Sequence, residues 1–67
     1  MDMKETLFEL AAHEKGLSWL GAFTEEDEQW FNDALGFPNG FEHDDVASLS
    51  IQDICDLINE FIICISE

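Results

Sequence analysis

The last third of the sequence carries an apolar stripe with the spacing of an α-helix. Ser50 precedes the stripe and Asp53 follows three residues later, which is the pattern of a capped helix N-terminus. A competing interpretation makes 62–65 a short strand, because β-branched residues favour extended structure, but the sequence offers no second alternating run to pair with it. We therefore predict a helix over 51–65. One of its faces would gather Ile51, Ile54, Cys55, Ile58, Phe61, Ile62 and Ile65.

A helix near the N-terminus is predicted by signals at both of its ends. Asp2 with Glu5 three residues later has the spacing of a capping box, and Gly16 is typical of a helix C-terminus. These signals predict a helix over 3–15. Its apolar face would hold Met3, Leu7, Leu10 and Ala11, with Phe8 at the margin. The apolar run over 17–23 is ambiguous between a helical turn and an extended connection, and we favour a turn or short helix.

The middle of the sequence predicts one more helix followed by a loop. Thr24 is a good N-cap, four acidic residues follow it where the helix dipole favours them, and Gly36 suits the end. This predicts a helix over 25–35, whose apolar side would hold Trp30, Phe31, Ala34 and Leu35. Pro38 and the Asn-Gly pair after it predict a loop with a tight turn over 36–44.

Together these elements predict a single all-α domain over 1–67, a small bundle of three main helices. A chain of 67 residues buries only about 60% of the surface that its unfolded form exposes, so its core is small. Leu57, Ile63 and Cys64 make the helix over 51–65 apolar nearly all round. We therefore expect that helix at the centre of the bundle, or shared with a second copy in a homodimer.

The charge of the chain limits its partners. Sixteen acidic residues against two lysines give a formal net charge of −14, and such a surface repels nucleic acid and anionic lipid. A partner is therefore expected to be a basic protein. Because 46% of the residues are hydrophobic, the chain should fold rather than form a disordered acidic tail. The N-terminal residues lack the basic start and long apolar run of a targeting segment, so we expect a cytoplasmic protein.

The acids themselves form the strongest functional pattern. Acids at i, i+3 and i+7 on a helix recur about every 4.5 to 6 Å along the axis, and one strand of duplex DNA carries a charge about every 3.4 Å. Acids that only solubilise a helix are usually mixed with bases, whereas this chain has only Lys4 and Lys15. The predicted partner-binding residues are Glu25, Glu26, Asp27, Glu28, Asp53, Asp56 and Glu60, followed by Asp2, Glu5 and Glu9.

Motifs for catalysis or for a cofactor are not found in the sequence, and we expect neither an enzyme nor a cofactor. His13 and His43 are interpreted as solvent-facing side chains. A divalent cation held by the acids around His43 is the sharper alternative, although the order of a calcium loop is missing. Cys55 and Cys64 would point to opposite sides of one helix, so we interpret both as reduced thiols packed in the core.

The residues Ala47-Ser48-Leu49 before an acidic, aliphatic helix resemble the acyl carrier proteins, in which an Asp-Ser-Leu motif carries phosphopantetheine at the start of a helix. This resemblance would make Ser48 the attachment site of a truncated carrier. Ala47 stands where that family has Asp, and the later helices that enclose the acyl chain have no counterpart. A serine is also common just before a helix, which is a simpler account of Ser48.

Small size, high acidity and the lack of catalytic groups resemble the phage-encoded inhibitors of bacterial defence, notably the anti-CRISPR proteins and other DNA mimics. The resemblance covers size and composition over the whole chain and no motif. It implies a protein in the cytoplasm of a bacterial host that blocks the basic channel of a nucleic-acid-binding complex. The alternative is an acidic adaptor that binds a basic host protein without displacing nucleic acid. Trp19, Phe37 and Phe41 are candidate apolar anchors for such a partner, although core positions are the commoner role of aromatics.

Overall fold

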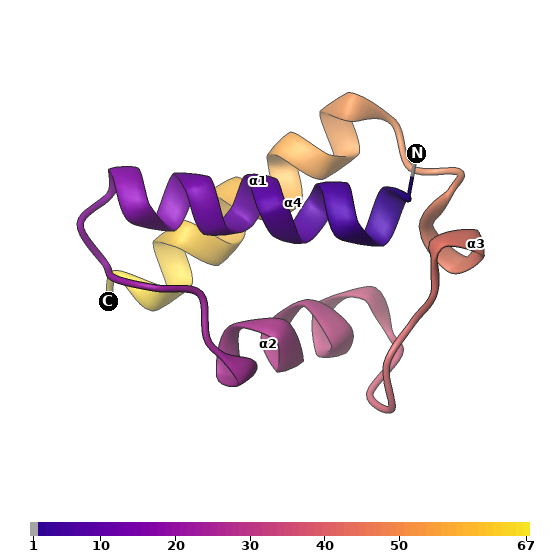
Figure 1. The fold of residues 1–67 in the computed structure, drawn as a ribbon, viewed down its shortest axis with the longest axis horizontal. Helices are drawn as coiled ribbons and strands as arrows, with labels where there is room; N and C mark the ends of the chain where they lie inside the picture. The colour runs from indigo at the N-terminus through magenta and orange to yellow at the C-terminus, as the bar shows by residue number, and fades with distance from the viewer. Residues whose placement is uncertain (1) are drawn as a thin grey trace.

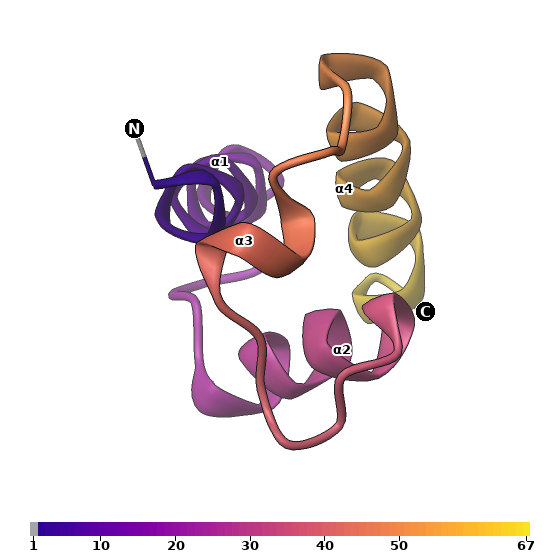
Figure 2. The same ribbon diagram turned by 90° about the vertical axis from the view of Figure 1, so that its right-hand side faces the viewer.

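The computed structural model describes residues 2–67, and within them the chain is helical with no strand. Its helices are α1 (Met3–Leu17), α2 (Glu25–Leu35), α3 (His43–Val46) and α4 (Ile51–Ile65). Helices α1 and α4 cross each other, and α2 lies along the other side of the molecule (Figure 1). Seen from its end, the molecule has α1, α2 and α4 at the corners of a triangle, with α3 beside the start of α1 (Figure 2). The predicted all-α fold is confirmed, and the competing strand over 62–65 is wrong.

Side-chain caps set the starts of the three longer helices at the predicted residues. Asp2 Oδ1 accepts hydrogen bonds from the backbone N–H groups of the first turn of α1, at 3.0 Å for Lys4. Thr24 opens α2 and Ser50 opens α4 with capping boxes. Each cap satisfies backbone donors that have no partner within the helix, which is why short polar residues at these positions fix the starts.

The end of α1 corrects the prediction that this helix stops at Gly16. The helix continues to Leu17, and Trp19 takes the left-handed conformation at φ 61°. Leu20 N–H then donates to the carbonyl of Lys15 at 3.2 Å, which closes the helix in the manner of a Schellman motif. Glycine usually fills that left-handed position, and the glycine that served as the sequence signal, Gly16, lies three residues before it. A turn does follow, as favoured for 17–23, and the chain is then irregular up to α2.

The predicted loop over 36–44 also contains an unexpected helical turn. Gly36 ends α2 in the left-handed conformation at φ 87°, as predicted, and Pro38 lies in the turn that follows. Helix α3 then begins at His43, after a capping box in which Glu42 N–H donates to Asp45 Oδ2 at 2.8 Å. Such a short helix contains no apolar periodicity, so the sequence pattern could not reveal it.

The core is a cluster of phenylalanine rings closed by aliphatic side chains. Phe31 of α2 and Phe61 of α4 are fully buried, with ring centroids 4.7 Å apart. Phe8 is half-buried against the core, as expected for the margin of the α1 face, and lies within 6 Å of three other rings. The α1 and α2 faces are rotated from the prediction, since Leu10 is 44% exposed and Ala34 is exposed.

Helix α4 has the predicted bounds but buries a narrower face than the predicted stripe. Ile54, Ile58 and Phe61 are buried, whereas Ile51 is 82% exposed. Cys55 is exposed, and so is Cys64, so the prediction that these thiols pack in the core is wrong. The covered side of α4 is defined by Ile54, Ile58 and Phe61, which belong to the core cluster shared with α1 and α2.

Candidate partner-binding surface

The two lysines differ in how far the fold engages them, because Lys15 is buried in an ion pair whereas Lys4 is half-buried and lies over an aromatic ring. Lys15 Nζ donates to Asp27 Oδ2 and to the carbonyl of Ala22, the latter at 2.8 Å. Lys4 is half-buried, and its Nζ lies 5.1 Å from the centroid of the Phe41 ring, where a cation is attracted to the π face. The two positive charges therefore stabilise the interior and do little to offset the acids that face solvent.

Asp27 is a correction to the predicted partner-binding set. Its side chain is only 8% exposed and is paired with Lys15. Burial by itself would raise the pKa of Asp27, but hydrogen bonds from Lys15 and Thr24 outweigh this effect and hold the pKa below its usual range. The Asp27 carboxylate therefore stays ionised inside the fold and is unavailable to a partner. The sequence analysis did not anticipate this pair, although Asp27 occupies the third position after the Thr24 N-cap, where a side chain turns back toward the cap.

Every other acidic side chain is exposed, including the remaining predicted partner-binding residues. Glu25, Glu26 and Glu28 lie in the first turn of α2. Asp2, Glu5 and Glu9 lie at the start and along the outside of α1. The exposed charge that a partner meets is therefore almost entirely negative, and it is spread over different helices.

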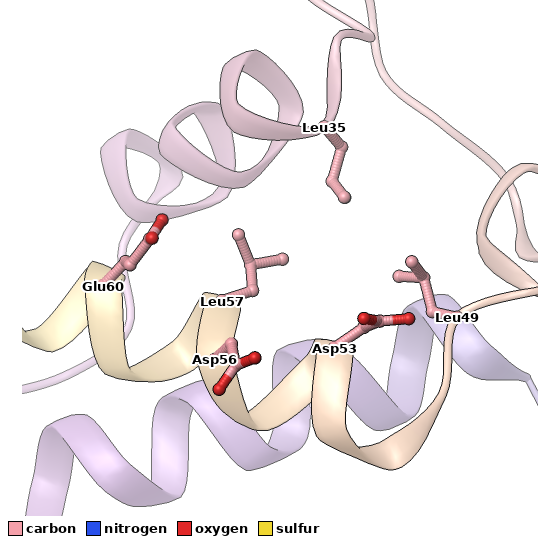
Figure 3. Close-up of a pocket in the computed structure, with 6 residues that line it drawn as sticks. All are labelled: Leu35, Leu49, Asp53, Asp56, Leu57 and Glu60. Atoms are coloured by element: carbon pink, nitrogen blue, oxygen red, sulfur yellow. The ribbon is translucent and has the colours of Figure 1, made fainter.

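The remaining predicted acids, all on α4, line a hollow that the sequence analysis did not anticipate. Asp53, Asp56 and Glu60 surround it together with Leu35, Leu49 and Leu57 (Figure 3). Leu35 and Leu57 point toward one another across the hollow, and Leu49 closes one side. Its volume is about 370 Å³. One residue indicated this hollow in the sequence, because Leu57 is apolar although it lies outside the predicted apolar face of α4.

The two histidines differ in role. His13 is exposed, as predicted. His43 is half-buried, because its Nδ1 accepts a hydrogen bond of 2.6 Å from Met3 N–H and so ties α3 to the first turn of α1. The solvent-facing interpretation of His43 therefore holds only in part, since its side chain is 41% exposed but also bonds to α1. Within residues 2–67, no group of three or more His, Cys, Asp or Glu side chains is arranged to hold a metal ion.

Among the predicted apolar anchors, only Trp19 is fully accessible. Trp19 is 94% exposed, whereas Phe41 belongs to the core and Phe37 is half-buried beside it at a centroid distance of 6.1 Å. Ser48, the candidate carrier attachment site, is exposed in the turn before α4, and Ser50 rather than Ser48 caps that helix. In the described part of the chain, no helix has the length and apolarity needed to cross a membrane.

Comparison of the chain with models of protein families, with curated proteins and with solved structures finds no match. The surface combines exposed carboxylates with an apolar hollow edged by acids, while Lys15 is paired inside the fold.

Proposed function

We propose that this protein inhibits a nucleic-acid-binding protein or complex by occupying its basic surface, in the manner of the anti-CRISPR proteins and other DNA mimics. The observation that carries the proposal is the single sign of the exposed charge. All acids except Asp27 face solvent, while Lys15 is paired inside the fold and Lys4 is half-buried over the Phe41 ring. A surface of this kind attracts a lysine- and arginine-rich groove and repels nucleic acid.

The arrangement of the carboxylates supports substitution for phosphates. Asp53, Asp56 and Glu60 lie on one capped helix, so successive carboxylates are about 4.5 to 6 Å apart along the axis. Fixed charges at that spacing displace the counterions of a basic groove much as phosphates do, and they accelerate encounter by long-range attraction. Stability alone does not favour such a surface, because like charges repel and few bases are present to form i,i+4 pairs.

A second candidate function is an acidic adaptor that binds a basic protein without displacing nucleic acid. The hollow between α2 and α4 favours the adaptor, because its three leucines offer an apolar contact that mimicry by charge alone does not require. Competition separates the two functions, because a mimic and a nucleic acid cannot occupy one groove together.

The test is a pull-down from bacterial lysate with the tagged protein, at low and moderate salt, with and without excess duplex DNA. Mimicry predicts capture of a nucleic-acid-binding protein that DNA displaces. A triple variant, Glu25→Gln, Glu26→Gln and Glu28→Gln, changes exposed side chains only and serves to show whether capture depends on the charge of α2. A partner retained in excess DNA would establish the adaptor instead, and no partner at either salt would leave the acids as solubilising groups.

A further inference from the structure

The hollow at α4 combines an apolar floor with a charged edge. Leu35 comes from the end of α2, Leu49 from the segment before α4, and Leu57 from α4 itself, and all three are half-buried. The carboxylates at its edge belong to three exposed residues of the same helix (Figure 3). Because the two chemistries meet in one depression, an occupant must satisfy both.

The carboxylates at the edge keep oxygen atoms free to accept hydrogen bonds. Asp53 uses Oδ2 to accept from Ser50 N–H at 3.0 Å, and Asp56 uses Oδ1 to accept from Gln52 Nε2 at 2.9 Å. In the described part of the chain, each therefore keeps a second oxygen without a hydrogen bond, and these internal bonds hold both side chains in place. Lys4 and Lys15 are engaged elsewhere in the fold, so the negative charge of this edge is available to an external cation.

We propose that this hollow binds an arginine side chain of a partner protein, an inference that rests on the proposed function and names the partner's chemistry. The aliphatic stem of arginine would lie on the leucines, and its planar guanidinium would donate to the carboxylates. Guanidinium suits this site better than ammonium, because it is weakly hydrated and presents five donors in a plane. The volume of about 370 Å³ is near the lower end of the range of about 300 to 1,000 Å³ for ligand pockets, which fits one side chain with a neighbouring residue.

A second copy of this chain is a poor occupant of the hollow. The sequence contains no arginine, and its two lysines are already used within the fold. Contact between two copies at this face would therefore bring carboxylates against carboxylates. Charge complementarity instead selects a basic partner.

The experiment uses n-butylguanidinium as a probe of the arginine side chain. The full-length protein, labelled at leucine methyl groups, is titrated and followed by NMR at constant ionic strength. We expect saturable shifts of the methyl signals of Leu35, Leu49 and Leu57. Methylguanidinium, which lacks the stem, and n-butanol, which lacks the charge, should each bind several-fold more weakly, and n-butylammonium should fall between them and the full probe. If methylguanidinium or n-butanol saturated the leucine methyl shifts at the same concentration as n-butylguanidinium, the proposal would be overturned.

A pair of charge-matched variants separates binding at this site from general attraction. The variant Asp56→Asn, Glu60→Gln should bind the probe roughly threefold to tenfold more weakly. The variant Glu14→Gln, Asp44→Asn carries the same net charge but changes exposed side chains of α1 and α3 that do not line the hollow, and it should bind like the unmodified protein. Equal weakening in both variants would overturn the proposal. If the variant Asp56→Asn, Glu60→Gln captured the same partner as the unmodified protein, and DNA still displaced that partner, the hollow would be excluded as the arginine site. The mimicry proposal would then stand without it.

Discussion

At the scale of single residues, Trp19 departs furthest from what its position favours. It is a large aromatic side chain, 94% exposed, on a backbone with φ 61°. The left-handed region costs a residue other than glycine about 1 to 2 kcal/mol, and exposure of the ring recovers none of that energy. The position suits glycine better for folding, which makes Trp19 the strongest remaining candidate for an apolar anchor.

Replacement of Trp19 by glycine should therefore stabilise the free protein. We expect Trp19→Gly to raise the free energy of unfolding by up to about 1 kcal/mol, since the relief of strain exceeds the added entropy of the unfolded chain. Urea denaturation measures this change. Trp19→Ala is the matched control, because it removes the ring and keeps the strain, and it should leave stability nearly unchanged. A glycine variant no more stable than the alanine variant would show that the conformation is not strained.

The buried ion pair provides a second prediction at this scale. Lys15→Met keeps much of the lysine stem but leaves the Asp27 carboxylate buried without its cation, which should lower the free energy of unfolding by about 3 kcal/mol. The double variant Lys15→Met, Asp27→Asn should recover part of the loss, because the buried charge is gone. Thermal and urea denaturation of the unmodified protein and the two variants check this. If Lys15→Met left the free energy of unfolding unchanged, water would have to solvate the Asp27 carboxylate.

The same pair predicts a dependence on pH. The pKa of Asp27 is lower in the folded than in the unfolded chain, so the unfolded state binds more protons as the pH falls. The stabilisation by Asp27 is thus full above its usual pKa and is lost as the pH falls through about 4 toward the folded pKa. Protonation of the other acids relieves repulsion over the same range, so the informative quantity is the difference in unfolding free energy between the unmodified protein and Asp27→Asn. That difference should shrink on acidification; a constant difference would contradict the pairing.

At the scale of helices, end signals predicted better than faces did. Ser50 and Asp53 placed the start of α4, because a cap is a local interaction between neighbours in sequence. The buried face was only partly predicted, because periodicity shows which residues share a side and tertiary contacts decide how much of it is covered. Ile51 is thus exposed despite its place in the stripe, and Leu57 instead reaches the hollow beside Leu35.

Helix α3 shows the limit of local reasoning most clearly. It begins at His43, whose Nδ1 accepts the Met3 N–H from a segment 40 residues away in sequence. Spacing within either segment gives no indication of this bond. The hollow escaped prediction for a related reason, since Leu35 and Leu49 come from separate segments that only the folded chain brings together with α4.

The acids of α4 should have unequal effects on stability, because only one of them caps the helix. Asp53→Ala removes the acceptor of Ser50 N–H and should lower the free energy of unfolding by about 1 kcal/mol. Asp56→Asn with Glu60→Gln should leave stability equal or slightly higher, since it reduces repulsion between acids four residues apart by a few tenths of a kcal/mol. Thermal melting compares the two variants. A greater loss in the double variant would contradict a capping role confined to Asp53.

At the scale of the whole molecule, the dominant force outside the core is repulsion among like charges. A net charge of −14 is carried by a body of 31 × 23 × 17 Å, so most pairs of acids lie within a few Debye lengths at low salt. The six phenylalanines supply the opposing attraction through their shared cluster. Composition alone predicted this balance, whereas the internal pairing of Lys15 with Asp27 required the structure.

Salt should therefore act in opposite directions on the free protein and on its complex. Raising the salt from low to moderate should increase the melting temperature by several degrees, since about 1 kcal/mol shifts a domain of this size by about 4 to 8 °C. The same change should weaken partner binding, because the charges that repel within the chain attract the partner. Calorimetry of the free protein checks the first effect, and a melting temperature that falls with salt would contradict the dominance of repulsion.

The measurement that tests mimicry most directly is a displacement titration with the purified partner from the pull-down. The partner is first saturated with a fluorescently labelled nucleic acid, and fluorescence anisotropy follows addition of this protein. Mimicry predicts complete release of the labelled strand at a stoichiometric amount of protein, and an apparent affinity that falls in proportion to added nucleic acid. A complex that holds partner, nucleic acid and this protein together would contradict it.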